Sequence, residues 1–335
     1  MSDDRRAALS AWVAQALNES QCALRPASGD ASFRRYFRVY TPGGATFIAM
    51  DAPPGKEDCR PYVRIARAFR AIGLNVPEII AEELARGFLL ITDLGDRLYL
   101  NALNERTVDA LYDDALKALL VLQRDAGTKA LPPYDEKLLH REMELFREWY
   151  IGRHLGIVLS ASAHAVLDRA FRGLAAAALE QPRVAVHRDY HSRNLLLTDA
   201  NNPGILDFQD AVVGPVTYDL VSLLRDCYIA WPRERVESWA REYFTKARGA
   251  GVPVGDDAGG FLRWLDLTGA QRHLKAVGIF ARLNYRDAKP DYLGDVPRVL
   301  SYVIDVSQRY SELHELAALV AGLPAKTDHT TAGPA

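Results

Sequence analysis

Four polar residues near the middle of the chain have the types and the spacing that phosphoryl transfer requires. His187, Asp189 and Asn194 follow the pattern H-x-D-x-x-x-x-N, and Asp207 comes thirteen residues after the asparagine, directly before Phe208. Transfer of a phosphoryl group from a nucleotide needs a carboxylate that orients the attacking hydroxyl and accepts its proton, together with oxygen ligands for Mg²⁺. Asp189 suits the first task, and Asn194 and Asp207 suit the second.

Each of these residues also has a simpler explanation when it is taken alone. Asp189 and Asp207 could be carboxylates that cap loop backbone, and Asn194 could be a turn residue. The occurrence of all four residues at this spacing, among short strands, favours the chemical interpretation. We therefore predict that Asp189 is the catalytic residue and that Asn194 and Asp207 are the metal ligands.

The elements that must position these residues are short strands. The apolar runs VAV and LLL on either side of the loop HRDYHSRN are too short to be helices and are bounded by turn-forming residues. The segment DANNPG predicts a hairpin turn to the run ILDF. The charged loop thus leaves one strand and enters the next, and its polar side chains are expected to converge with Asp207 at the strand ends.

The rest of the chain changes character once along its length. Between residues 27 and 94, the β-like runs FRRYFRVY, ATFIAM and GFLLITDL flank one helix-like segment at residues 62–72. After Gly95 the apolar residues recur with a helical period, over residues 104–124, 136–154, 163–179, 218–228, 233–246 and 261–283. The pattern predicts an α+β fold with a small β-rich N-terminal lobe (residues 1–94), a larger helical C-terminal lobe (residues 95–323) and a disordered tail (residues 324–335).

Composition and charge argue against several classes of protein. The 335 residues are 49% hydrophobic and 25% charged with a net charge of −2, so no nucleic-acid partner is expected. Cys22, Cys59 and Cys227 lie far apart, which argues against a disulfide framework or a zinc site. No apolar run reaches the roughly 18 residues of a membrane span, and no signal peptide is visible. We expect a cytoplasmic monomer that binds a small molecule and no membrane.

The segment VAVHRDYHSRNLLLTDANNPGILDF resembles the catalytic core of the aminoglycoside phosphotransferase family, a branch of the protein-kinase-like superfamily. The likeness extends over residues 27–316 and implies a two-lobe protein-kinase-like fold, a nucleotide-binding N-terminal lobe, and ATP and Mg²⁺ as cofactors. It also implies that Asp219 anchors the catalytic loop by hydrogen bonds, with His187 in structural support. A helix N-cap is an equally simple explanation of Asp219.

Two details distinguish this chain from protein kinases. His191 stands where protein kinases place a lysine, two residues after the catalytic aspartate. The segment DFQDAVVGPVTYDL replaces their DFG motif and activation loop. Both differences favour a small-molecule substrate over a protein.

The resemblance implies nucleotide binding by two further segments. The loop SGDASFRRYFRV has one glycine where the family has several, so a plain hairpin turn is the alternative. The backbone N–H groups of this loop could still bind phosphates, with Arg34 or Arg35 adding donors. The segment GFLLITDLG resembles the linker whose backbone pairs with adenine. The expected nucleotide-binding residues are Ser28, Gly29, Asp30, Ala31, Ser32 and Phe33 in the loop, and Thr92, Asp93 and Leu94 in the linker. Met50 stands where kinases present a phosphate-binding lysine, so Lys56 or a loop arginine would replace that charge.

Substrate binding is expected from the helical lobe. Glu142 is the one charged residue within an apolar helical arc, so a buried partner must compensate it. The partner is either a structural arginine or sugar hydroxyls, with Trp149 as a stacking face. Arg193 is a further candidate for steadying phosphate or substrate.

A second helical segment carries a basic stripe, which is either a solvated face or part of the substrate site. At 100° per residue it places these side chains on one side: Arg272, Lys275, Arg282 and Arg286. Residues 225–309 contain 14 Lys and Arg against 11 Asp and Glu. This balance favours a neutral or anionic substrate over a polycationic aminoglycoside.

Three other segments are similar to one subgroup of the family, the kinases that phosphorylate the anomeric (C1) hydroxyl of N-acetylmuramate and N-acetylglucosamine in cell-wall recycling. The segments are MDAPPGKED, LFREWY and RHLKAVGIFARLNYRDAKPDYLGDVPRVLSYV. The lactyl carboxylate of N-acetylmuramate would suit the basic stripe. The alternatives are a kinase of another hydroxyl acceptor, such as an aminoglycoside or a choline-like metabolite, and a nucleotide-binding regulator without catalysis.

Overall fold

The N-terminal part of the chain is an antiparallel sheet. The structure is a computed structural model that describes residues 3–29 and 33–324. Five strands pair in the order β1-β2-β3-β5-β4. Their bounds are Ala23–Gly29 (β1), Arg35–Tyr40 (β2), Thr46–Asp51 (β3), Ile79–Glu83 (β4) and Phe88–Thr92 (β5). Strand β5 reads FLLIT, a continuous apolar run that is typical of a strand covered on both faces.

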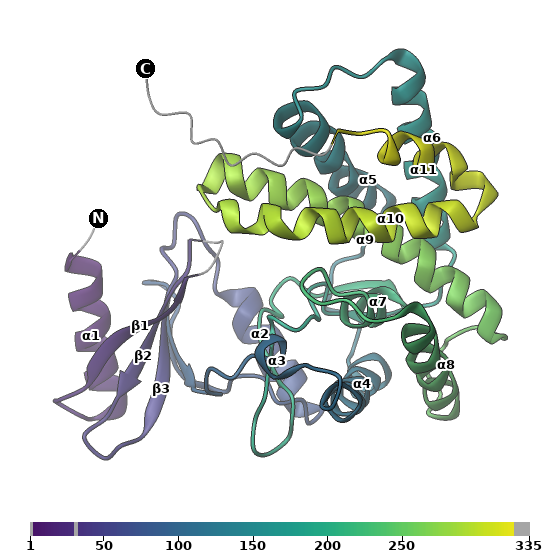
Figure 1. Cartoon of the computed structure of the whole chain (residues 1–335). Coiled ribbons are helices and arrows are strands. Elements are labelled where there is room, and N and C mark those ends of the chain that lie inside the picture. The colour runs from purple at the N-terminus through teal and green to yellow at the C-terminus, as the bar shows by residue number, and fades with distance from the viewer. Residues whose placement is uncertain (1–2, 30–32, 325–335) are drawn as a thin grey trace, which may run out of the picture.

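One helix covers each face of this sheet. Helix α1 (Asp3–Leu17) lies on the outer face, where Leu9 and Val13 pack against Phe37 and Phe88. Helix α2 (Arg60–Ala71) lies between the sheet and the helical part of the chain (Figure 1). The sequence did not predict α1, because only two of the side chains described over residues 4–17 are buried and the apolar periodicity is correspondingly weak.

The C-terminal part is mainly helical. Its helices are α3 (Tyr99–Ala102), α4 (Val108–Asp125), α5 (Glu136–Leu145), α6 (Ala161–Leu179), α7 (Tyr218–Leu224), α8 (Arg233–Gly249), α9 (Ala258–Asp287), α10 (Val296–Arg309) and α11 (His314–Ala321), with the π-helix η1 (Phe146–His154) and the 3₁₀ helices η2 (Pro290–Asp295) and η3 (Ser311–Leu313). Helix α9 is the longest and contacts α5, α6, α7, α8 and α10. Within the described ranges, no helix combines the length and apolar character needed to cross a membrane.

The predicted helix over residues 136–154 is divided in the structure. It is α-helical up to Leu145 and continues as the π-helix η1 from Phe146. The change occurs where Gly278 of α9 crosses: a Cβ at Gly278 would lie 2.3 Å from the Leu145 carbonyl carbon. The missing side chain lets the two backbones approach closely.

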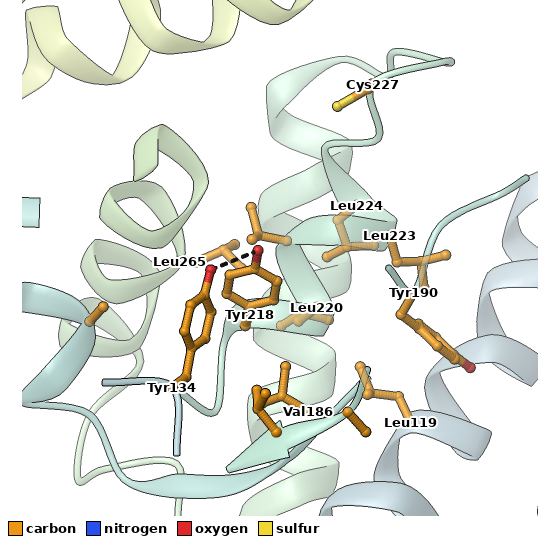
Figure 2. Close-up of a cluster of buried hydrophobic side chains, with 14 of the residues drawn as sticks. Leu119, Tyr134, Val186, Tyr190, Tyr218, Leu220, Leu223, Leu224, Cys227 and Leu265 are labelled. Atoms are coloured by element: carbon orange, nitrogen blue, oxygen red, sulfur yellow. Dashed lines mark hydrogen bonds between the residues drawn. The ribbon is translucent and has the colours of Figure 1, made fainter. Parts of the chain in front are cut away.

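Two short ribbons interrupt the helices and carry the loop with the predicted catalytic residues. Strand β6 (Arg183–Val186) pairs with β9 (Val212–Pro215), and β7 (Leu195–Leu196) pairs with β8 (Gly204–Ile205). A buried cluster supports the loop from below, and it includes Val186, Tyr190, Leu220 and Tyr218 (Figure 2). The Tyr190 hydroxyl donates a hydrogen bond of 2.7 Å to the Ala115 carbonyl of α4, which ties the loop to the core.

Candidate active site

The two ribbons bring Asp189, Asn194 and Asp207 into one region. Leu195 pairs with Ile205, and the Leu206 N–H donates to the Asn194 carbonyl at 2.9 Å, so Asn194 lies beside the segment that carries Asp207. The Asn194 side-chain amide donates to the Asp189 carbonyl at 3.0 Å. This bond orients the amide and leaves its oxygen as the atom able to bind a cation.

His187 connects the loop to the same ribbon. Its Nε2 lies 2.9 Å from the Leu206 carbonyl, and since a carbonyl can only accept, Nε2 carries the proton. Nδ1 accepts from the Asp189 N–H at 3.3 Å. Burial lowers the pKa of His187, in agreement with a neutral ring that accepts on one nitrogen and donates on the other. His187 therefore links the backbone of Asp189 to the residue that precedes Asp207.

Asp219 anchors the start of the loop. Its fully buried carboxylate accepts hydrogen bonds from the backbone N–H groups of His187, at 2.6 Å, and Arg188, at 2.9 Å. Arg188 has a φ of 79°, a left-handed conformation that is unusual for a residue other than glycine and that needs such support. The N-cap of α7 is Thr217, so the alternative role of Asp219 as the N-cap is not realised. Burial raises the pKa of Asp219 to about 6.

A second buried aspartate, which the sequence did not predict, holds the other end of the loop. Asp226 accepts from the Ser192 N–H at 2.9 Å and from the Tyr228 N–H at 2.9 Å. Its signal in the sequence was an acidic residue between apolar runs in SLLRDCYI, the same kind of signal that singled out Glu142. The two aspartates fix the loop at both ends.

Asp189 lies in a strongly positive environment. Burial alone would raise the pKa of its carboxyl group, but Lys275, His191, Arg188 and Arg272 outweigh burial and lower the pKa to about 2. Asp189 is therefore ionised at neutral pH. A carboxylate with so low a pKa is a good hydrogen-bond acceptor and a weak base.

Glu142 has protein partners on both carboxylate oxygens. Oε1 pairs with the Arg188 guanidinium and lies 3.2 Å from the Lys275 ammonium, and Oε2 accepts from the Tyr134 hydroxyl. The Tyr134 hydroxyl is also within 3.2 Å of the Tyr218 hydroxyl (Figure 2). Of the two partners considered for Glu142, the structure has the structural arginine, joined by a lysine of the basic stripe.

A cleft of about 690 Å³ opens beside Asp189. Four of the residues singled out in the sequence line it, namely Asp189, Glu142, Lys275 and Arg282 of the basic stripe. Three predicted substrate residues lie outside this lining: Trp149 is beneath the Arg153 guanidinium at 5.7 Å, Arg193 stacks on Tyr228 at 4.0 Å, and Arg272 points toward the Cys227 sulfur at 3.5 Å. Arg272 and Lys275 are buried, so that part of the stripe is not a solvated face.

The predicted phosphate-covering loop is described only in part. Ser28 and Gly29 end strand β1, while Asp30, Ala31 and Ser32 lie outside the described residues. Phe33 is exposed, and its backbone N–H donates to the Glu57 carboxylate at 3.2 Å.

Arg34 is a loop cation that lies close to the position of the absent kinase lysine. Buried Met50 and Arg34 line a small cavity of about 80 Å³ that also reaches Gln209 and Asp210. Arg34 forms a 3.8 Å ion pair with Glu57. Lys56 instead lies over the Phe33 ring at 4.5 Å. Of the two replacements considered, the structure brings Arg34 to this cavity.

The predicted linker residues follow strand β5. Thr92 exchanges hydrogen bonds with Glu78: its N–H donates to the Glu78 carbonyl at 3.0 Å, and its hydroxyl accepts from the Glu78 N–H at 2.9 Å. The Asp93 carboxylate pairs with Arg38 at 2.7 Å. The side chain of Asp93 is thus engaged in the protein, and recognition of a base by Asp93 and Leu94 would fall to the backbone.

The donor set suits a magnesium ion that is held mainly by phosphates. In the described part of the chain, no group of three or more His, Cys, Asp or Glu side chains is arranged to hold a metal. Asn194 and Asp207 offer amide and carboxylate oxygens, and Mg²⁺ is commonly bound by one or two such ligands with substrate phosphates and water. Asp207 has a φ of 60°, and its Oδ1 accepts from the Gln209 amide at 2.6 Å.

Comparison with known proteins identifies the family. The model of the phosphotransferase enzyme family (APH) matches residues 23–256. The chain belongs to this family. It is therefore a phosphotransferase, and membership implies the use of ATP as phosphoryl donor.

The curated relatives of this phosphotransferase cover nearly its full length. One from Pseudomonas aeruginosa (strain PAO1) is 48% identical over 335 residues, which span 97% of this chain and 98% of the relative. Another, from Neisseria meningitidis serogroup B, is 41% identical over 95% of this chain and 96% of its own. Both are named N-acetylmuramate/N-acetylglucosamine kinase.

Solved structures confirm the predicted protein-kinase-like α+β fold. Choline kinase LicA from Streptococcus pneumoniae matches with a TM-score of 0.64 at 12% identity, over 90% of this chain and 100% of its own. ADP-bound aminoglycoside phosphotransferase APH(2'')-Ib matches with a TM-score of 0.58 at 15% identity, over 90% and 98%. Likeness at this level of identity concerns the fold.

Proposed function

We propose that this phosphotransferase is an ATP- and Mg²⁺-dependent kinase of the anomeric (C1) hydroxyl of N-acetylmuramate and N-acetylglucosamine, acting in cell-wall recycling. The observation that carries the proposal is the cleft that is lined by ionised Asp189 and by more basic than acidic side chains. The names of the relatives support the two sugars as acceptors. A cationic lining disfavours kanamycin and choline, which carry positive charge.

In this proposal Asp189 orients the C1 hydroxyl and takes its proton. The hydroxyl oxygen attacks the γ-phosphorus, the bond from that phosphorus to the bridging oxygen of ADP breaks, and the hydroxyl proton moves to the Asp189 carboxylate. An anomeric hydroxyl is more acidic than other sugar hydroxyls, so it needs less help from a base. A carboxylate with a pKa of about 2 matches such an acceptor better than it would match an ordinary alcohol.

The neighbouring residues would position the reactants. Asn194 and Asp207 would hold Mg²⁺, which when bound supplies positive charge to the phosphates. Arg34 would contribute the charge that kinases place on a lysine, since it lines the cavity beside Met50. Positioning and charge neutralisation then account for most of the rate enhancement.

We also propose a cytoplasmic location. Cys22, Cys59 and Cys227 are free thiols, which fits a reducing compartment.

The decisive experiment is a coupled assay of ADP release with four acceptors: N-acetylmuramate, N-acetylglucosamine, kanamycin and choline. We expect turnover with the two amino sugars. Asp189→Asn should lower kcat by about 10²- to 10⁴-fold, because it removes the proton acceptor. Its affinity for ATP should stay within about twofold, because the acceptor hydroxyl and not the nucleotide is its proposed partner.

Asp199→Asn is the matched control for that variant. Asp199 is exposed in the turn of the β7–β8 ribbon and pairs with Arg97, so its loss should leave turnover unchanged. Full activity of Asp189→Asn would remove the catalytic assignment. Binding of ATP by the wild-type protein without turnover of any acceptor would favour a regulator instead.

A further inference from the structure

Three arginines line the cleft without an ion-pair partner. Among residues 3–29 and 33–324, Arg64 of α2, Arg141 of α5 and Arg282 of α9 make no hydrogen bond or ion pair to a carboxylate. Lys275 and Arg188, which line the same cleft, are both compensated by Glu142. The cleft therefore has a cationic end beside Asp189 whose charges are in direct contact with a carboxylate, and three further arginines without such a contact, although Asp210 also lines the cleft.

Arg282 is the most constrained of the three. It is half-buried, and its Nε is buried without any hydrogen-bond partner in the described part of the chain. Burial and the like charge of Arg286 lower the pKa of its guanidinium, and they outweigh the opposite charges of Asp287 and Glu142. A buried donor without an acceptor is unfavourable, and a bound anion would relieve that cost.

The position of Arg282 relative to Asp189 suits a substrate that spans the cleft. Lys275, Ile279 and Arg282 recur at i, i+4 and i+7, so they lie on one face of α9, and all three line the cleft. Lys275 lies near Asp189, and Arg282 is about two turns further along the helix. Ile279, with Leu145 of α5, provides an apolar surface between the two cations.

We propose that Arg282, assisted by Arg141, binds the carboxylate of an acidic amino-sugar substrate and thereby sets its affinity relative to the neutral sugar. The assignment rests on the proposed function. N-acetylmuramate differs from N-acetylglucosamine by a lactyl ether at C3, two ring positions from C1, which adds one carboxylate to the sugar. With C1 at Asp189, that carboxylate extends along the cleft toward Arg282, where a guanidinium can bind it with two parallel hydrogen bonds.

The test compares the two sugars as acceptors for one variant, Arg282→Gln. We expect KM for N-acetylmuramate to rise about ten- to a hundredfold, because a hydrogen-bonded charge pair is lost. KM for N-acetylglucosamine should stay within about twofold, because that sugar has no carboxylate for Arg282. Arg263→Gln is the matched control: it lies on the same helix outside the lining of the cleft, pairs with Glu312, and should change neither KM.

Each outcome of this test is decisive. A selective rise in KM for N-acetylmuramate, with an unchanged melting temperature, supports the assignment. An equal rise for both sugars, or no change for either, overturns it while the proposed function stands. If the wild-type protein phosphorylates neither sugar, the proposed function fails and this assignment fails with it.

Discussion

At the scale of the residue, Asp219 couples a protonation state to the shape of the catalytic loop. Its carboxylate accepts from two consecutive backbone N–H groups, those of His187 and Arg188. The ionised form can accept both bonds on its two oxygens, whereas protonation converts one oxygen into a donor. The left-handed turn at Arg188 then loses part of its support. Protonation of Asp219 should therefore disturb the position of Asp189.

This coupling predicts that kcat falls as the pH falls through about 6, the raised pKa of Asp219. Asp189 stays ionised over that range, because its pKa is about 2, and burial lowers the pKa of His191 to about 4. Neither of these groups can account for the same change. The measurement is kcat at saturating substrate between about pH 4.5 and 8.

The contribution of Asp219 to the free energy of unfolding should change with pH in the opposite direction to kcat. The pKa of Asp219 rises from 3.8 to about 6 on folding, so its stabilising contribution is fully present below 3.8 and is lost as the pH rises through 6. A fall in activity on acidification is thus not explained by unfolding at Asp219. In Asp219→Asn the fall of kcat at acidic pH should disappear. The activity of this variant at pH 7 should be lower than that of the wild-type protein. Persistence of the fall in that variant would contradict the assignment.

At the scale of the element, the substrate cleft depends on the close crossing of α9 and the junction between α5 and η1. Helix α9 contributes Lys275, α5 contributes Glu142, and the 3.2 Å contact between them requires the helices to stay close. Gly278 makes this possible because a Cβ there would lie 2.3 Å from the Leu145 carbonyl carbon. Backbone atoms cannot yield as a flexible side chain can.

Gly278→Ala should therefore destabilise the protein although alanine favours helices. We expect a loss of about 1–3 kcal/mol in the free energy of unfolding, because the helices must separate. Gly173→Ala in α6 is the matched control, since nothing lies within 4 Å of its Cβ position. That variant should be neutral or stabilised by up to about 1 kcal/mol. Denaturant unfolding compares the two, and equal effects would contradict the role of the crossing.

The sequence could predict the elements whose pattern is local, and it could not predict those that depend on contacts with distant segments. Helix α9 and the two ribbons have strong local patterns, so residues 261–283 and the strands around the loop were correctly placed. The π-helix could not be predicted, because the backbone that packs closely where it begins belongs to Gly278, more than a hundred residues away in the sequence. Trp149 was placed beside Glu142 on the assumption of 100° per residue, which η1 does not follow. The aspartates of the loop could be predicted because the chemistry requires their spacing. The partners of Glu142 could not, because they come from distant segments.

At the scale of the whole molecule, one core joins the sheet to the helical part. The larger cluster includes Met50 of β3, side chains of α2 and the interior of the C-terminal helices, while a smaller one lies under α1. Phe208 is central to this connection. Its ring packs against Tyr62 and Phe69 of α2, with centroid distances of 4.8 and 6.1 Å. Phe208 follows Asp207 directly, so the packing between the two parts of the fold also positions a proposed metal ligand.

Phe208→Leu should therefore weaken nucleotide binding more than its effect on stability would suggest. We expect a loss of about 1–2 kcal/mol in the free energy of unfolding. The rise in melting temperature on adding ATP and Mg²⁺ should shrink markedly, because that rise depends on affinity for the folded state. Phe171→Leu is the matched control: Phe171 is equally buried, but it lies in α6 under Arg147. That variant should lose similar stability and keep the full nucleotide-induced rise. If both variants keep it, the packing of Phe208 does not position Asp207, and the link between the core and the metal site has to be abandoned.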